Sequence, residues 1–115
     1  MRDAVIVSTA RTAIGKAYRG GFNATSGATL GSYSLKAAVA RAGIEGGEID
    51  DVLWGSALQQ GTQGGNLARQ VGLRAGLPVS VSGMTMDRQC SSGLMSIATA
   101  AKQIIVDNID IMAAG

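Results

Sequence analysis

The chain has 115 residues, a formal net charge of +2, 46% hydrophobic residues and 16% charged residues. This length allows one domain at most, and the composition excludes a disordered chain. The lysine and arginine residues are scattered and form no basic stripe with interleaved aromatic residues, which argues against nucleic acid as a partner. No apolar run is long enough to span a membrane, and Met1-Arg2-Asp3 does not open a signal peptide, so we expect a cytoplasmic protein.

The first predicted elements are a strand, a loop and a helix. Ala4–Val7 is short, apolar and β-branched, which predicts a buried strand. The glycine-containing stretch 11–29 predicts a loop whose length is typical of functional loops. Apolar residues at helical spacing follow, with Thr29 or Ser32 as the expected N-cap and Gly43 just past the end.

The next elements are two strands separated by a short helix. Asp50–Ala57 and Val79–Met86 contain the apolar runs of strands. Between them, Asn66 is the expected N-cap of a short helix, which Gly76 and Pro78 end.

The clearest predicted helix spans Ser91–Val106, with an apolar stripe that includes Leu94 and Ile97 and needs a covering layer. Ile109–Ala114 then begins a fourth strand that is apolar on successive residues, as in strands covered on both faces. The alternation of strands and helices predicts an α/β fold with a mostly parallel sheet, incomplete in residues 1–115.

Cys90 is the only cysteine, and it lies between the third predicted strand and the long helix. The first-turn N–H groups and the dipole of that helix favour a thiolate, and the same amides can form part of an oxyanion hole. The residues alone leave two interpretations open, a nucleophile or a small buried side chain. The chain has no histidine, and its acidic residues show no metal-ligand spacing, so we predict no metal site.

Three segments resemble motifs of the thiolase family. Met86–Ile97, which reads MDRQCSSGLMSI, closely resembles the acyl-enzyme motif of thiolases. Ala10–Lys16 resembles the motif after their first strand, and Gln60–Arg69 resembles their glycine-rich segment before the second helix. The three motifs stand in the family's order, and the resemblance covers essentially the whole chain.

Three positions depart from the family's usual pattern. Asp87 stands where thiolases usually have Asn, Ser or Thr, and Ala13 and Leu67 stand where they often have Pro. A carboxylate at position 87 opposes a nearby thiolate, because like charges repel. An Asp three residues before Cys-Ser-Ser also resembles β-ketoacyl synthases, which are relatives with the same fold. The opening motif and the early position of Cys90 favour a thiolase.

The resemblance implies a thiolase-like fold, of which residues 1–115 are the first part of the N-terminal domain. It implies an acyltransferase that uses coenzyme A as a substrate and binds no cofactor covalently. Cys90 would attack a 3-ketoacyl-CoA, acetyl-CoA would leave, and a second CoA would accept the acyl group; the condensation of two acetyl-CoA is the reverse type of reaction.

Thiolases also use histidines and a second cysteine from later in the polypeptide, so this chain alone is expected to be inactive. The family further implies a homo-oligomer of the full enzyme. Two alternatives stay open at this point: a non-catalytic thiolase-like protein that binds acyl-CoA or lipid, and a fragment of a β-ketoacyl synthase.

Overall fold

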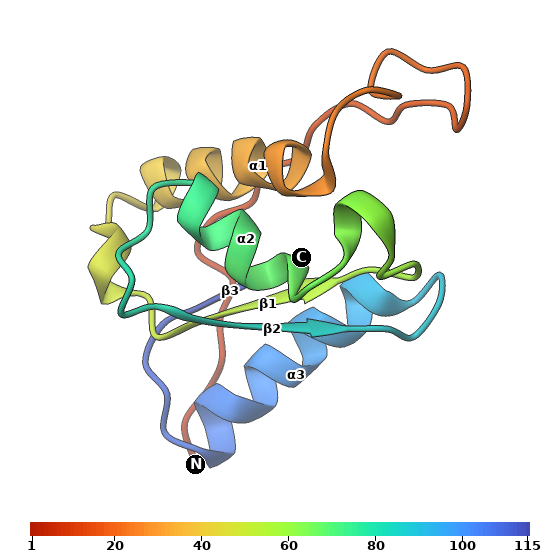
Figure 1. The fold of residues 1–115 in the computed structure, drawn as a ribbon. Coiled ribbons are helices and arrows are strands. Elements are labelled where there is room, and N and C mark those ends of the chain that lie inside the picture. The colour runs from red at the N-terminus through yellow and green to blue at the C-terminus, as the bar shows by residue number, and fades with distance from the viewer.

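The computed structural model describes residues 1–115 and has the α/β architecture that the sequence predicts. Three strands form one sheet in the order β2-β1-β3, and both pairings are parallel. Helices α1 and α2 lie on one face of the sheet and α3 lies on the other (Figure 1). The elements are α1 (Gly27–Ala42), η1 (Gly46–Glu48), β1 (Asp51–Gly55), η2 (Gly61–Gln63), α2 (Leu67–Arg74), β2 (Ser82–Met86), α3 (Ser92–Val106) and β3 (Met112–Ala114).

The ends of α1 and α2 follow from their capping residues. The Ser26 side chain accepts a hydrogen bond from the Thr29 backbone N–H at 3.2 Å, so the prediction of Thr29 or Ser32 as the N-cap is wrong. Ser26 takes this role because its extended backbone lets the hydroxyl reach back over the first turn. Gly43 ends α1 in the left-handed conformation and Asn66 caps α2, which confirms both predictions.

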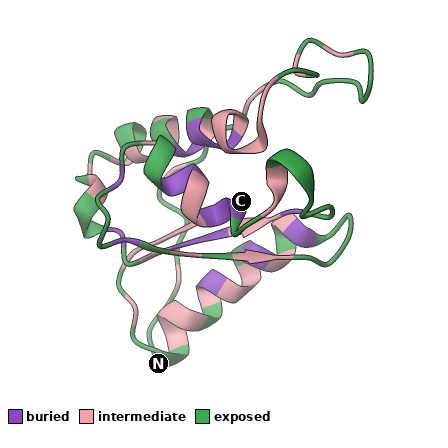
Figure 2. Cartoon of the chain, in the orientation of Figure 1, coloured by how far each residue is buried: buried purple, intermediate pink, exposed green.

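The core lies mainly between the sheet and the two helices α1 and α2 (Figure 2). Val52 and Leu53, neighbours in the central strand β1, are both fully buried. Since successive side chains of a strand point to opposite faces, Val52 joins the cluster under α1 and α2 while Leu53 faces α3. The cluster consists of Leu35, Ile49, Val52, Leu67, Ala68, Val71, Leu77 and Val81.

Hydrogen bonds hold the start of α2 close to β2. The Thr85 hydroxyl accepts from the Ala68 N–H at 2.8 Å and donates to the Asn66 side-chain oxygen at 2.9 Å. The Asn66 amide in turn donates to the Gly83 carbonyl at 2.8 Å. A Cβ on Gly83 would lie 2.7 Å from the Arg69 backbone nitrogen, so glycine is what permits this approach.

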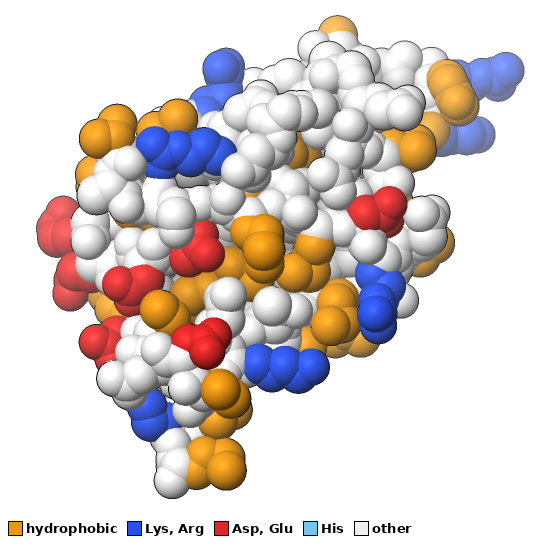
Figure 3. All heavy atoms as spheres, turned by 60° about the horizontal axis from the view of Figure 1, so that its bottom comes forward, with side chains coloured by type: hydrophobic (Ala, Val, Ile, Leu, Met, Phe, Trp, Pro, Cys, Tyr) orange, Lys and Arg blue, Asp and Glu red, His pale blue; other side chains and the backbone are white.

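Helix α3 packs on the opposite face of the sheet through small side chains. Its buried residues are Ser92, Ser96 and Ala100. By contrast, Leu94 is 73% exposed and Ile97 is 41% exposed, so the predicted apolar stripe is not the face that meets the sheet. Figure 3 brings this side of the molecule forward and shows hydrophobic side chains gathered in its middle. The predicted helix is confirmed, and its stripe has no covering layer in this chain.

The N-terminal segment is extended but belongs to no sheet, so the prediction of a strand at Ala4–Val7 is wrong. None of residues 1–15 makes a backbone–backbone hydrogen bond. A cavity of about 950 Å³ lies between this segment and β3, and apolar residues of α1 and α3 line it as well. A strand needs a hydrogen-bonded neighbour at about 4.8 Å, and the backbone of this segment has none.

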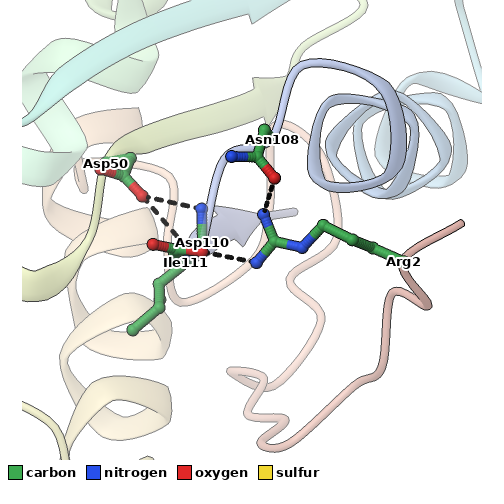
Figure 4. Close-up of polar contacts among 5 residues, drawn as sticks. All are labelled: Arg2, Asp50, Asn108, Asp110 and Ile111. Carbon is green, nitrogen blue, oxygen red and sulfur yellow. Dashed lines mark hydrogen bonds and ion pairs between the residues drawn. The ribbon is translucent and has the colours of Figure 1, made fainter.

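Side chains attach the N-terminus to the connection between α3 and β3 (Figure 4). The Arg2 guanidinium donates to the Asn108 side-chain oxygen at 2.8 Å and forms an ion pair with Asp110. The Asp50 carboxylate accepts from the backbone N–H groups of Asp110 and Ile111 at 3.2 and 3.1 Å. The same short connection therefore receives contacts from the N-terminus and from the residue before β1.

The loop predicted at residues 11–29 is confirmed for residues 11–26, because α1 begins at Gly27. This loop projects from the body of the molecule (Figure 1). Within it, the Gly20 N–H donates to the Lys16 carbonyl at 2.7 Å. A Cβ on Gly20 would lie 2.5 Å from Lys16 backbone atoms, which explains the glycine at this turn. None of the helices combines the length and the apolar character that a bilayer span requires.

Candidate active site

Cys90 lies in the tight turn that leads from β2 to α3, where the sequence places it. Within residues 1–115 its side chain is exposed and forms no disulfide. The residue before it, Gln89, has a left-handed backbone with φ 49°. This conformation costs a non-glycine residue about 1–2 kcal/mol, so the surrounding contacts must hold the turn.

Two side chains supply those contacts. The Ser92 hydroxyl accepts from the Arg88 backbone N–H at 2.9 Å and donates to the Gln89 carbonyl at 2.6 Å. The Asp87 carboxylate accepts from the Gln89 backbone N–H at 2.7 Å. The negative charge of Asp87 therefore faces a backbone donor inside the turn.

The start of α3 presents unpaired backbone N–H groups next to Cys90. Ser91 is the N-cap, but its side chain makes no capping hydrogen bond. The N–H groups of Gly93 and Leu94 have no backbone acceptor. Such amides, together with the positive end of the helix dipole, stabilise negative charge. The arrangement can thus stabilise an oxyanion beside Cys90.

The position of α3 relative to the sheet depends on Gly55 at the end of β1. A Cβ on Gly55 would lie 2.4 Å from the Ser92 carbonyl carbon and 2.6 Å from the Gly93 nitrogen. Both are backbone atoms, so they cannot move aside as a flexible side chain could. The glycine therefore lets the first turn of α3, and with it the turn at Cys90, sit directly on the central strand.

The large cavity is not at the candidate nucleophile. Cys90 is absent from its lining, which comes from the N-terminal segment, α1, α3 and β3. No group of three or more histidine, cysteine or acidic side chains gathers in a metal-binding arrangement.

The sequence predicts Cys90 as a candidate site residue, but it did not indicate the contacts that Ser92 and Gly55 make at the same turn. The signal for Ser92 was a hydroxyl two residues after the cysteine, at the first position of a helix. The signal for Gly55 was a glycine that ends β1, the strand paired with β2, which leads into the turn at Cys90.

Comparisons with known proteins agree with this geometry. The family model "Thiolase, N-terminal domain" matches residues 4–115. The chain is 45% identical to a 3-ketoacyl-CoA thiolase of Bacillus subtilis and 41% identical to an acetyl-CoA acetyltransferase of Cupriavidus necator, over 115 residues in each case. Both alignments cover 100% of this chain and 29% of the relative.

A solved structure shows the same fold. The chain resembles the crystal structure of the Bacillus anthracis acetyl-CoA acetyltransferase with a TM-score of 0.92 and 37% sequence identity. This match covers 100% of the chain and 29% of the solved one, so the chain spans 29% of the length of these relatives. On the match over residues 4–115, the chain belongs to the thiolase N-terminal domain family.

Proposed function

We propose that residues 1–115 are the first part of a thiolase, an acyltransferase that uses coenzyme A as a substrate and Cys90 as its nucleophile. The observation that carries this proposal is the exposed thiol of Cys90 at the start of α3, inside a chain that matches the thiolase N-terminal domain. The relatives named 3-ketoacyl-CoA thiolase and acetyl-CoA acetyltransferase support the same class of reaction.

In the proposed reaction, the Cys90 sulfur attacks the keto carbon of a 3-ketoacyl-CoA and forms a carbon–sulfur bond. The bond between the second and third carbons of the acyl group then breaks. Its electron pair leaves with the acetyl-CoA fragment, which takes up a proton. The thiol of a second coenzyme A attacks the acyl-cysteine, gives up its proton, and releases a shortened acyl-CoA and free Cys90. The same steps in reverse condense two acetyl-CoA.

Residues outside this chain must complete the proposed site. The sequence contains no histidine and no cysteine other than Cys90, so it offers no imidazole to accept the proton of the thiol and no second thiol for proton transfer. We therefore propose that the complete enzyme supplies these groups from later residues, that it is a homo-oligomer, and that it works in the cytoplasm. The one cysteine of residues 1–115 is free, which is consistent with a reducing compartment.

Acylation of Cys90 is the direct test. The complete enzyme is mixed with acetyl-CoA and no second substrate, and the acetyl group is mapped by peptide mass spectrometry. We expect it on Cys90, and we expect Cys90→Ser to lower the thiolysis rate by about a thousandfold or more, because a hydroxyl ionises far less than a thiol.

The alternatives give different outcomes in the same experiment. A non-catalytic acyl-CoA or lipid-binding protein would bind acetyl-CoA and leave Cys90 unmodified. A β-ketoacyl synthase would accept the acyl group from an acyl-carrier protein in preference to coenzyme A. Acylation of another residue, or of none, would refute the proposal.

A further inference from the structure

The turn that presents Cys90 is held by side chains that flank it in the sequence. Of the backbone groups around the left-handed Gln89, the N–H of Arg88 and the C=O of Gln89 bond to the Ser92 hydroxyl, and the N–H of Gln89 bonds to Asp87. We propose that Ser92 and Asp87 are positioning residues for the nucleophile. Their hydrogen bonds fix the turn and so hold the Cys90 sulfur beside the first-turn N–H groups of α3. This inference rests on the proposed function, because it concerns the same cysteine.

The chemistry of the Ser92 hydroxyl suits this role. One oxygen both donates and accepts here, a combination that a hydroxyl provides and that an alanine side chain lacks. Ser92 is only 4% exposed, so water cannot replace its hydrogen bonds easily. Its backbone also packs directly on Gly55. The clamp, by which we mean the hydrogen bonds of Ser92 and Asp87 to the turn, is therefore anchored to the central strand of the sheet.

Asp87 contributes the remaining hydrogen bond of the clamp, in which it accepts from the Gln89 N–H. The Oδ1 atom that accepts from the Gln89 N–H is the atom that an asparagine would also offer. The role therefore requires an acceptor at this position and does not require the negative charge. An alanine removes the acceptor, whereas an asparagine keeps it.

The test uses the complete enzyme with two pairs of variants. Ser92→Ala removes the clamping hydroxyl, and Ser91→Ala is its control, since Ser91 is exposed and its side chain makes no capping hydrogen bond. Asp87→Ala removes the acceptor, and Asp87→Asn is its control. For each variant, kcat and KM are measured well below the unfolding temperature, and the melting temperature is recorded.

We expect Ser92→Ala and Asp87→Ala to lower kcat about tenfold or more while KM changes less than about twofold, because small misplacements of a reacting atom have large effects on rate. The controls should stay within about twofold of the parent on both parameters. A purely structural role would lower the melting temperature and leave the kcat of the folded enzyme unchanged. That outcome in both Ser92→Ala and Asp87→Ala would refute the inference.

A second readout separates this inference from the proposed function. Alkylation of Cys90 by iodoacetamide requires no thiolase activity, and it should slow about threefold or more in Ser92→Ala and Asp87→Ala, because the sulfur loses its register with the helix amides. If the parent enzyme is not acylated by acetyl-CoA, the proposed function fails, and the alkylation rates still decide the positioning role. Equal alkylation rates in the parent and in both variants would overturn it. Should Ser92→Ala not fold, the Asp87 pair decides alone.

Discussion

Helices α2 and α3 lie on opposite faces of the same sheet, yet they meet it with different surfaces. Helix α2 buries large and small apolar side chains, among them Leu67, Ala68 and Val71. Helix α3 buries Ser92, Ser96 and Ala100 and leaves Leu94 mostly exposed. The first packing is driven by apolar burial, whereas the second brings two backbones close together and satisfies hydroxyls with hydrogen bonds.

The face of the sheet under α2 mainly stabilises the fold, whereas the face under α3 mainly fixes the position of that helix. Hydrophobic burial is roughly proportional to area and tolerates small shifts, while a close backbone contact fixes one geometry. The contact between Gly55 and the start of α3 lies two residues from Cys90, and it uses the second kind of packing. The apolar stripe of α3, which includes Leu94 and Ile97, stays partly exposed in this chain.

The largest effect should come from isolating the chain, which leaves that stripe open. We expect the 115-residue chain expressed alone to show no thiolysis of acetoacetyl-CoA and to aggregate, because it combines exposed apolar side chains on α3 with an incomplete set of catalytic groups. Light scattering and an activity assay check this prediction. A soluble monomer with a cooperative thermal transition would contradict the folding part, and turnover would contradict the catalytic part.

The burial face of α2 should give the next largest effect. Leu67→Ala in the complete enzyme should cost about 2–5 kcal/mol of unfolding free energy, because it opens a cavity in the core. Leu73→Ala on the outer side of the same helix is the matched control and should cost less than about 0.5 kcal/mol. Urea unfolding followed by circular dichroism measures both. Equal losses would show that α2 does not bury the face described here.

The contact beneath α3 should give a smaller loss of stability but a clear loss of rate. Gly55→Ala should cost about 1–3 kcal/mol, because the added Cβ meets backbone atoms at 2.4–2.6 Å. It should also slow the acylation of Cys90 by moving the start of the helix. Gly47→Ala is the control, since the nearest atom to its Cβ would be 3.5 Å away, an ordinary contact. Unchanged acylation in Gly55→Ala would mean that this contact does not set the position of Cys90.

The smallest effect is expected from Asp87→Asn. The substitution keeps the acceptor for the Gln89 N–H, so steady-state kcat should stay within about twofold of the parent. A loss of more than about a hundredfold, the low end of general acid–base contributions, would instead identify Asp87 as a catalytic acid or base.

Elements with local signals were predicted well from the sequence. Asn66 and Gly76 bracket α2, and Gly43 ends α1, because a cap or a left-handed glycine acts on the residues next to it. The position of Cys90 between β2 and α3 followed from the same kind of local pattern. The parallel pairing of β1 with β2 and β3 followed from the alternation of strands with helices.

Features that depend on distant residues were not predicted. Ala4–Val7 has a strand's composition, but pairing requires a neighbour that composition does not reveal, and β3 lies across the cavity. The face of α3 that meets the sheet could not be chosen from its periodicity, because Gly55 permits a close approach by serine and alanine. The clamp by Ser92 depends on the left-handed turn at Gln89, which is a fact of three-dimensional geometry.

The attachment of Arg2 to Asp110 has a consequence for the order of folding. The two residues are 108 positions apart, and closing a flexible loop of that length costs about 4 kcal/mol of chain entropy. An exposed ion pair returns about 0–1 kcal/mol, so it cannot close the loop by itself. The strands and helices between the two residues must form first and bring the ends together. The segment around Arg2 therefore docks after these elements, and the amides of residues 1–15 should be among the first to exchange with deuterium.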